Sequence, residues 1–319
     1  MTNDKYTPKR YLLMTLDPVH VGTGGYRLGR VDLSIVREPG TNLPKIPGTS
    51  LSGALRQYAA MRYEKMQCAG KDGHCGKPEC PICYTFGTAA GSAGKVNIFD
   101  ARLLLFPVHS LAGPVWVTSP QTLADFDIKA EQNVDKDKAK WPDGLTNQSR
   151  LNLGWLMLER EAVWQPPQIN GVPEEVQKRI VLVSDARFSQ IVNSNLEVRT
   201  SVSINPQTGA AEDGALFTYE ALPRATYLWC DVVQDDFQGQ FPTTSRKCKR
   251  EEQQTKDGKT EWIYLDNQGE LLEREWSCPL DVVEDALRLL EYLGIGGMGT
   301  RGFGRVKQIY AWEVEHDSK

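Results

Sequence analysis

Four cysteines within sixteen positions constrain this chain more than any other feature of its sequence. Cys80 and Cys83 form a C-x-x-C pair, with Cys68, His74 and Cys75 just upstream. Thiolate and imidazole ligands this close together are typical of structural zinc sites, which hold the ion tetrahedrally with four such groups. We therefore predict a zinc-binding insertion at 66–94, in which the four cysteines and His74 compete for four ligand positions.

Two other uses of these cysteines fit the sequence less well. A redox-active C-x-x-C pair usually begins a helix after a strand, whereas this pair is surrounded by loop-forming residues: Gly70, Gly73, Gly76, Pro78 and Pro81. A catalytic zinc site needs a water-activating partner, and no glutamate here sits in a recognisable motif of that kind. Seven cysteines, an odd number in a chain whose N-terminus has no signal sequence, favour a reducing cytoplasm.

The charge of the chain is unevenly distributed. Its net charge is −4, but residues 1–65 contain ten basic and five acidic side chains, so this block carries +5 and the remainder −9. A basic N-terminal block on an acidic body indicates a local anion-binding surface rather than a protein that coats nucleic acid throughout. No apolar run approaches the roughly 20 residues that cross a bilayer, so we expect a cytoplasmic protein with no membrane partner.

Helical and alternating apolar patterns follow one another along the chain. Helical spacing predicts one helix from Thr49 or Ser50 to about Glu64 and an amphipathic helix over 280–293. Strands are predicted at 10–16, 30–37, 95–106, 180–183 and 227–233, a hairpin at 196–204 and 215–221, and a closing strand up to 314. Polar composition predicts insertions at 125–150 and 236–276. This order of elements indicates an α+β sheet protein.

A glycine-rich stretch connects the last predicted helix to the last predicted strand. It holds six glycines between Gly294 and Gly304, with Arg301 and Arg305 among them. Glycines let a backbone approach a ligand closely and present its N–H groups to an anion. A mononucleotide-binding loop follows a strand and precedes a helix, and here the order is reversed. The stretch therefore favours contact with a polynucleotide backbone, and a flexible turn is the alternative interpretation.

The basic N-terminal block contains two further candidate sites. The helix start at Thr49 and Ser50 directs unpaired N–H groups outward, which makes a natural phosphate site that Arg56 extends. Asp32 lies between apolar neighbours and close in sequence to several arginines. A carboxylate in that setting is either one partner of an ion pair or a catalytic group, and the residues alone leave both interpretations open.

Several motifs, taken together in this order, resemble one known family. They are His20–Gly24, Val31–Glu38, Ile46–Arg56, Asp100–Leu104, Phe106–Ser110, Gly214–Phe217 with Glu220, and Gly294–Gly304. This set is similar to the backbone subunit of type III CRISPR effector complexes, which belongs to the RAMP superfamily, and more similar to its Cmr branch. The resemblance covers residues 10–312 apart from the polar insertions, and the cysteine insertion resembles that of the Csm branch.

The resemblance implies a single domain over residues 1–319 with an α+β, ferredoxin-like (RRM-type) core. A β-hairpin thumb at 193–222, the zinc-binding insertion at 66–94 and polar loop insertions at 125–150 and 236–276 are added to that core. Copies or homologues of the chain stack along a guide CRISPR RNA beside other type III effector subunits. The thumbs kink the duplex that the guide forms with a single-stranded target RNA.

The resemblance also implies cleavage of the target RNA at regular intervals, with Asp32 as the catalytic residue and His20 in a supporting role. In the metal-dependent cleavage that it implies, Asp32 either ligates the catalytic Mg or Mn or accepts the proton of the attacking hydroxyl. The candidate RNA-binding residues are Arg27, Arg30, Arg37, Thr49, Ser50, Arg56, Gly296, Gly297, Gly299, Arg301, Gly302 and Arg305. A non-catalytic RNA-binding subunit is the alternative, and a metal-independent guide-processing ribonuclease is the least favoured because the chain has only four histidines.

Overall fold

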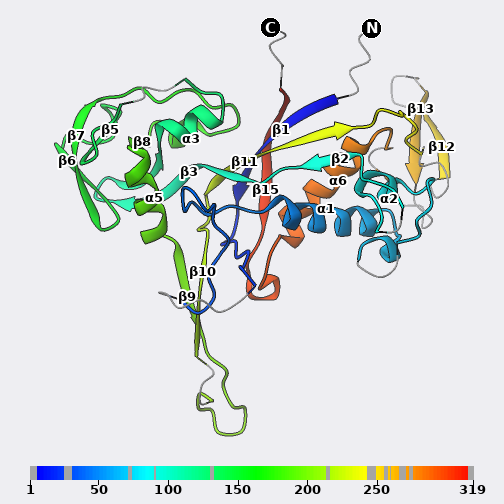
Figure 1. Cartoon of the computed structure of the whole chain (residues 1–319), viewed down its shortest axis with the longest axis horizontal. Helices are drawn as coiled ribbons and strands as arrows, with labels where there is room; N and C mark the ends of the chain where they lie inside the picture. Colours follow the sequence, from blue (N-terminus) through cyan, green and yellow to red (C-terminus); the bar gives the residue numbers. More distant parts are fainter. Residues whose placement is uncertain are drawn as a thin grey trace. The chain divides into compact units, whose positions relative to one another are not determined.

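The computed structural model describes residues 6–24, 31–70, 74–89, 91–129, 133–212, 216–242, 249–254, 258, 260–265, 271–272 and 276–314. The chain divides into two compact units (Figure 1). One, here called the cysteine unit, comprises Met1–Pro8, Ser52–Ile98 and Val232–Leu289. The other, here called the sheet unit, comprises Lys9–Leu51, Phe99–Asp231 and Leu290–Lys319.

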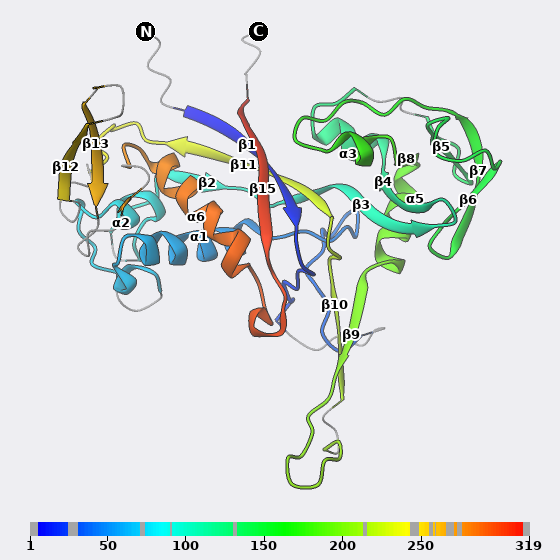
Figure 2. The same ribbon diagram turned by 180° about the vertical axis from the view of Figure 1, so that it is seen from behind.

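A mixed β-sheet organises the sheet unit, with the strand order β15-β1-β11-β3-β4-β8-β5-β7-β6. Its strands are β1 Tyr6–Thr15, β3 Arg102–Ser110, β4 Gly113–Thr118, β5 Lys138–Trp141, β6 Arg150–Leu153, β7 Leu156–Val163, β8 Ile180–Val183, β11 Tyr227–Asp235 and β15 Val306–Glu313. The pairs β1–β15 and β3–β4 are antiparallel, whereas β4–β8 and β5–β7 are parallel. Figure 2 shows the first and last strands, β1 and β15, side by side. The predicted α+β class is confirmed.

The core of the sheet unit forms around the middle strands. All four residues of β8 are fully buried, which is typical of a strand covered on both faces. Helices α3 (Pro120–Asp125), α4 (Glu174–Gln177) and α5 (Asp185–Ser194) belong to this unit. Leu12, Leu104, Phe126, Leu182 and Tyr227 are members of one continuous apolar cluster. Polar segment 125–150 supplies β5 to the sheet, with Ala139 and Trp141 buried, which its composition did not predict.

One arginine of the basic N-terminal block is buried inside this core. Arg10 donates two hydrogen bonds to Asp231, at 2.8 and 3.0 Å, and a third to Asp127 at 2.7 Å. Its guanidinium lies 4.3 Å from the ring centroid of Trp229. A buried charge needs such pairing because removal from water is costly. Part of the basic excess of residues 1–65 therefore serves folding and not anion binding.

The predicted strand at 95–106 is in fact two strands, β2 (Val96–Ile98) and β3. Between them, Ala101 pairs with Ile46, and the Asp100 carboxylate accepts a 2.7 Å hydrogen bond from the N–H of Gly48. Asp100 thus caps the first residue of helix α1 (Gly48–Arg62), which interrupts the strand. The helix itself lies close to its predicted bounds.

After α5 the chain forms a long hairpin that projects away from the sheet, as Figures 1 and 2 show. Its strands β9 (Glu197–Ser201) and β10 (Phe217–Ala221) pair antiparallel, with Thr200 opposite Thr218. The predicted hairpin is confirmed. Exposed aliphatic side chains line this arm and its continuation: Val198, Val202, Ile204 and Leu216.

The cysteine unit is mainly helical, with most of α1, the short helices η1 (Met66–Cys68) and α2 (Pro81–Phe86), and most of α6 (Pro279–Leu293). Strand β2 pairs with residues 232–234 at the end of β11. Strands β12 (Lys249–Gln254), β13 (Thr260–Leu265) and β14 (Leu271–Leu272) form a small antiparallel sheet within the predicted insertion 236–276. Within the described residues, no helix is both long and apolar enough to span a membrane.

We predict that Arg10→Met destabilises the protein by about 3 kcal/mol, because it leaves the Asp231 carboxylate without its partner in a low-dielectric setting. Urea unfolding followed by tryptophan fluorescence measures this change. Arg150→Met is the matched control, because the Arg150–Glu159 pair has side chains 65% and 53% exposed and such pairs contribute at most about 1 kcal/mol. Equal unfolding midpoints for the two variants would contradict the prediction.

Candidate functional site

Asp32 is an exposed carboxylate that is held on one side by strand β10. Its Oδ2 accepts hydrogen bonds from the Thr218 backbone N–H at 2.7 Å and from the Thr218 hydroxyl at 2.9 Å. The Asp32 N–H donates in return to the Thr218 hydroxyl at 3.1 Å. The backbone and hydroxyl hydrogen bonds from Thr218 hold the pKa of Asp32 below its usual value. The carboxylate is therefore ionised at neutral pH.

The segment that carries Asp32 lies between two neighbours. On one side Leu33 pairs with Tyr219 of β10, and on the other Ile35 pairs with Gly22. Arg37 then pairs with Pro44. Within the described part of the strand predicted at 30–37, residues 33–37 are joined to their neighbours by isolated bridges at every second residue and not by a continuous ladder.

Glu220 is a buried carboxylate that organises this region from β10. Its Oε1 accepts hydrogen bonds from the Ile35 N–H at 2.9 Å and from the Arg37 guanidinium at 2.6 Å. Arg37 also donates to the Asn193 side chain at 2.7 Å, so this predicted RNA-binding arginine has partners within the chain. The ion pair fixes the segment that follows Asp32.

His20 is 6% exposed and belongs to the packed part of the site. Its Nδ1 lies 2.6 Å from the Glu220 carbonyl oxygen, and because a carbonyl only accepts, Nδ1 carries the proton. The His20 carbonyl accepts a 2.8 Å hydrogen bond from the Gly297 N–H. His20 thus joins β10 to the glycine-rich stretch, an arrangement that suits a supporting role.

The glycine-rich stretch folds back on itself, and close approach explains three of its glycines, Gly294, Gly296 and Gly304. A Cβ at Gly296 would lie 2.3 Å from the His20 carbonyl oxygen, and one at Gly304 would lie 2.5 Å from the Ile295 carbonyl oxygen. The Ile295 N–H closes the loop with a 2.8 Å hydrogen bond to the Gly304 carbonyl. Gly299 and Gly302 have open space where a Cβ would lie. Packing therefore accounts for part of the pattern that predicted ligand contact, and Gly299 and Gly302 face outward.

Arginines and aromatic rings alternate where the glycine-rich stretch contacts the hairpin. Tyr219 and Phe303 are buried against each other with ring centroids 5.4 Å apart. Arg301 lies 5.7 Å from the Phe217 ring, and Arg199 lies 4.6 Å from the Phe303 ring. Arg301 is exposed, while Arg305 pairs with Asp17. Because Tyr219 and Phe303 are buried, this surface offers the positive charge of its exposed arginines, and not these two ring faces, to an anion.

The predicted phosphate site at the start of α1 is partly occupied by the protein itself. Asp100 accepts from the Gly48 N–H and pairs with Lys45, and the pKa of Asp100 is lowered because these interactions outweigh burial. Thr49 is exposed, and the Ser50 N–H is bonded to the Pro47 carbonyl at 2.9 Å. Arg27 and Arg30, also predicted to bind RNA, lie outside the described residues.

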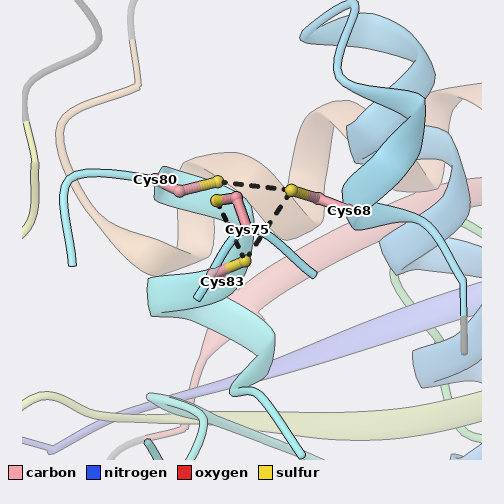
Figure 3. A group of neighbouring side chains, drawn as sticks. All are labelled: Cys68, Cys75, Cys80 and Cys83. Atoms are coloured by element: carbon pink, nitrogen blue, oxygen red, sulfur yellow. Dashed lines mark hydrogen bonds between the residues drawn. The ribbon is translucent and has the colours of Figure 1, made fainter. Parts of the chain in front are cut away.

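The four clustered cysteines of the cysteine unit come together around one point (Figure 3). Their sulfur atoms all lie within 4.8 Å of one another, with Cys75–Cys83 at 3.7 Å and both Cys80–Cys68 and Cys83–Cys68 at 3.8 Å. A tetrahedral ion with metal–sulfur bonds of about 2.3 Å places its sulfur atoms about 3.8 Å apart. The group therefore has the geometry of a metal site.

The charges around this group also suit a cation. Burial, followed by the proximity of Cys80, raises the pKa of the Cys83 thiol to about 12. Burial would also raise the pKa of Cys75, but hydrogen bonds from the Lys77 backbone and from neighbouring side chains, including Lys65, lower it to about 6. Neighbouring thiolates repel one another, so a bound cation is what would let all four ionise.

His74 does not belong to the sulfur group. Its Nδ1 accepts a 2.7 Å hydrogen bond from Arg56, whose guanidinium also donates to the carbonyls of Cys68 at 2.7 Å and Gly87 at 2.8 Å. Arg56, predicted to bind RNA, thus supports the loop that carries the cysteines. No local pattern in the sequence predicts this role of Arg56 or the role of Thr218, because the two look like ordinary residues of a helix and a strand.

Comparisons with known proteins identify the relatives of this chain. It matches the family model of the RAMP superfamily over residues 12–307. It is 30% identical over 253 residues to the CRISPR system Cmr endoribonuclease Cmr4 of Pyrococcus furiosus, covering 70% of this chain and 81% of that protein. It is 36% identical over 136 residues to the CRISPR system Cms endoribonuclease Csm3 of Methanothermobacter thermautotrophicus, covering 37% of this chain and 52% of that protein.

Solved structures share the fold. A chain in the cryo-EM structure of type III-B Cmr-beta bound to cognate target RNA superposes with a TM-score of 0.62 at 17% identity, covering 94% of this chain and 95% of that one. Oligomeric Cmr4 from Pyrococcus furiosus superposes with a TM-score of 0.57 at 20% identity, covering 97% and 99%. The chain therefore belongs to the RAMP superfamily, as a homologue of the Cmr backbone subunit.

Proposed function

We propose that this chain binds guide RNA as a backbone subunit of a type III CRISPR interference complex and cleaves target RNA at regular intervals through Asp32. The observation that carries the proposal is an exposed, ionised carboxylate on a segment bonded to the hairpin strand, in a RAMP chain. Two relatives are named endoribonucleases, which supports the reaction class. Among the proposed RNA contacts, Arg301, Thr49, Gly299 and Gly302 are exposed.

The proposed reaction is attack of a target 2′-hydroxyl on the adjacent phosphate. The O2′–P bond forms and the P–O5′ bond breaks, the hydroxyl proton passes to water and the 5′-oxygen takes a proton from water, which leaves a 2′,3′-cyclic phosphate and a 5′-hydroxyl. Such a reaction needs in-line geometry and stabilisation of the charge that develops on the phosphate oxygens. The hairpin supplies the geometry by holding the duplex in a kinked form, and its exposed aliphatic side chains are suited to contact with an unstacked base.

Asp32 is better suited to hold a cation than to accept the hydroxyl proton. A general base works best when its pKa lies near the working pH, and the pKa of Asp32 lies below the ordinary carboxyl value. A single carboxylate fits Mg or Mn, because such ions are often held by one or two carboxylates together with substrate phosphates and water. When bound, the ion would neutralise charge on the phosphate. Asp32 would then orient the phosphate relative to the hairpin.

We also propose that Cys68, Cys75, Cys80 and Cys83 hold a structural zinc ion. Their sulfur spacing and the supporting bonds from Arg56 to the carbonyls of Cys68 and Gly87 are consistent with a closed site. His74 remains outside the proposed ligand set because its Nδ1 accepts from Arg56. The ion would order a loop that has few other means of folding.

Asp32→Asn tests the nuclease proposal, because it keeps the shape of the side chain and removes the charge. In the assembled complex we expect normal assembly and target binding, with periodic target cleavage reduced by at least about a hundredfold. Gel analysis of a labelled target in Mg or Mn measures this loss. Asp125→Asn is the control, an exposed carboxyl of α3 that is not in the site.

Unchanged cleavage by the Asp32→Asn complex would favour the non-catalytic RNA-binding subunit instead. Loss of assembly would show that Asp32 serves the fold through its bonds to Thr218 and would also contradict the proposal as stated. Cleavage by the isolated subunit without metal would point to a guide-processing ribonuclease.

Elemental analysis of fresh protein is expected to find one zinc ion per chain. Cys80→Ser combined with Cys83→Ser is expected to abolish zinc binding and lower the melting temperature, because metal binding contributes directly to folding free energy. Cys278→Ser, a cysteine outside the group, is expected to keep the zinc. Absence of zinc from the wild-type protein would contradict the assignment.

A further inference from the structure

Thr218 contacts Asp32 through both of its donors. Its N–H and hydroxyl both bind Oδ2, and the Asp32 N–H bonds the same hydroxyl, although the two residues are 186 positions apart. Within the described part of the chain, Thr218 is the one other residue that donates a hydrogen bond to this carboxylate. Two donors on one oxygen fix the rotation of the carboxylate.

The hydroxyl of Thr218 is not needed to build the hairpin. Its backbone pairs with Thr200 across β9 and β10, a pairing that valine would support equally well because β-branched residues suit strands. The hydroxyl is instead committed to Asp32. Among the described residues, the hydroxyl bonds Asp32 alone, through its carboxylate and its N–H, which points to a role at that residue.

The same strand ties the whole Asp32 segment to the hairpin. The Leu33 N–H donates to the Thr218 carbonyl at 3.0 Å, and the Glu220 N–H donates to the Leu33 carbonyl at 3.2 Å. Any displacement of β10 by bound RNA is therefore passed to the carboxylate. Precise placement matters, because a shift of about 1 Å at a reacting group costs about a hundredfold in rate.

We propose that Thr218 is a positioning residue that locks the Asp32 carboxylate to strand β10, so that the hairpin that contacts the RNA and the carboxylate that cuts it move as one body. The inference rests on the proposed function of Asp32. It explains how cleavage keeps a constant offset from the point where the hairpin meets the duplex.

Thr218→Val tests this inference, since it preserves shape and the backbone N–H while removing the hydroxyl. Complexes assembled with the variant are assayed for target affinity and for single-turnover cleavage at saturating target. We expect cleavage to fall about tenfold, the scale of one hydrogen bond to a charged group, with affinity and assembly unchanged. Thr218→Ser restores the donor and is expected to recover the rate to within about twofold.

The control is Thr146→Val, which removes a hydroxyl that accepts a 3.2 Å bond from the Gln148 N–H in a surface turn. It is expected to cleave at the wild-type rate. A wild-type rate for Thr218→Val would overturn the inference, as would equal losses in the valine and serine variants. Asp32→Asn in the same assay separates the two proposals: if it cleaves normally, the proposed function fails, whereas if only Thr218→Val cleaves normally, the positioning role fails.

Discussion

The hydrogen bonds of a single residue, Glu220, hold the candidate site together. Its N–H bonds Leu33, its carbonyl accepts from His20, and its buried carboxylate accepts from Ile35 and Arg37. Through these groups one position on β10 fixes the segment that follows Asp32 and the residue that contacts the glycine-rich stretch. A buried carboxylate with this many partners is costly to disturb, since each partner would lose its own bond as well. The exposed Asp32 carboxylate is thus next to a segment held by a buried, satisfied network.

Regular elements with long periodic patterns were predictable from the sequence. Strand β8 coincides with its predicted range, and the hairpin and both long helices lie close to theirs, because their apolar spacing is set by burial. The break between β2 and β3 was not predictable, because it depends on Asp100 reaching the start of α1. Strands β12 to β14 lie in a hydrophilic segment where composition gives little periodic signal.

In the candidate site, too, some features were predictable from the sequence and others were not. Asp32, His20 and the glycine-rich stretch were predicted because their residue types and order carry a family resemblance. Thr218 was not, because its role comes from a contact across 186 positions and not from its local pattern. Arg37 and Arg56 look like RNA-binding residues in sequence, yet both donate hydrogen bonds within their own unit. Arg37 bonds Glu220, and Arg56 bonds the loop that carries the cysteines. Charge in a sequence does not tell where a side chain finds its partner.

The closed glycine-rich stretch also offers a position at which a label could be attached to the protein. Ile295 and Gly304 seal its base by a backbone hydrogen bond, and the close contacts at Gly296 and Gly304 admit no added side chain. Gly299, near its tip, faces open space with an ordinary backbone angle. A cysteine introduced there would carry a fluorophore beside Arg301 without straining the loop. Gly299 is thus a position at which an optical reporter of the proposed RNA contact could be attached.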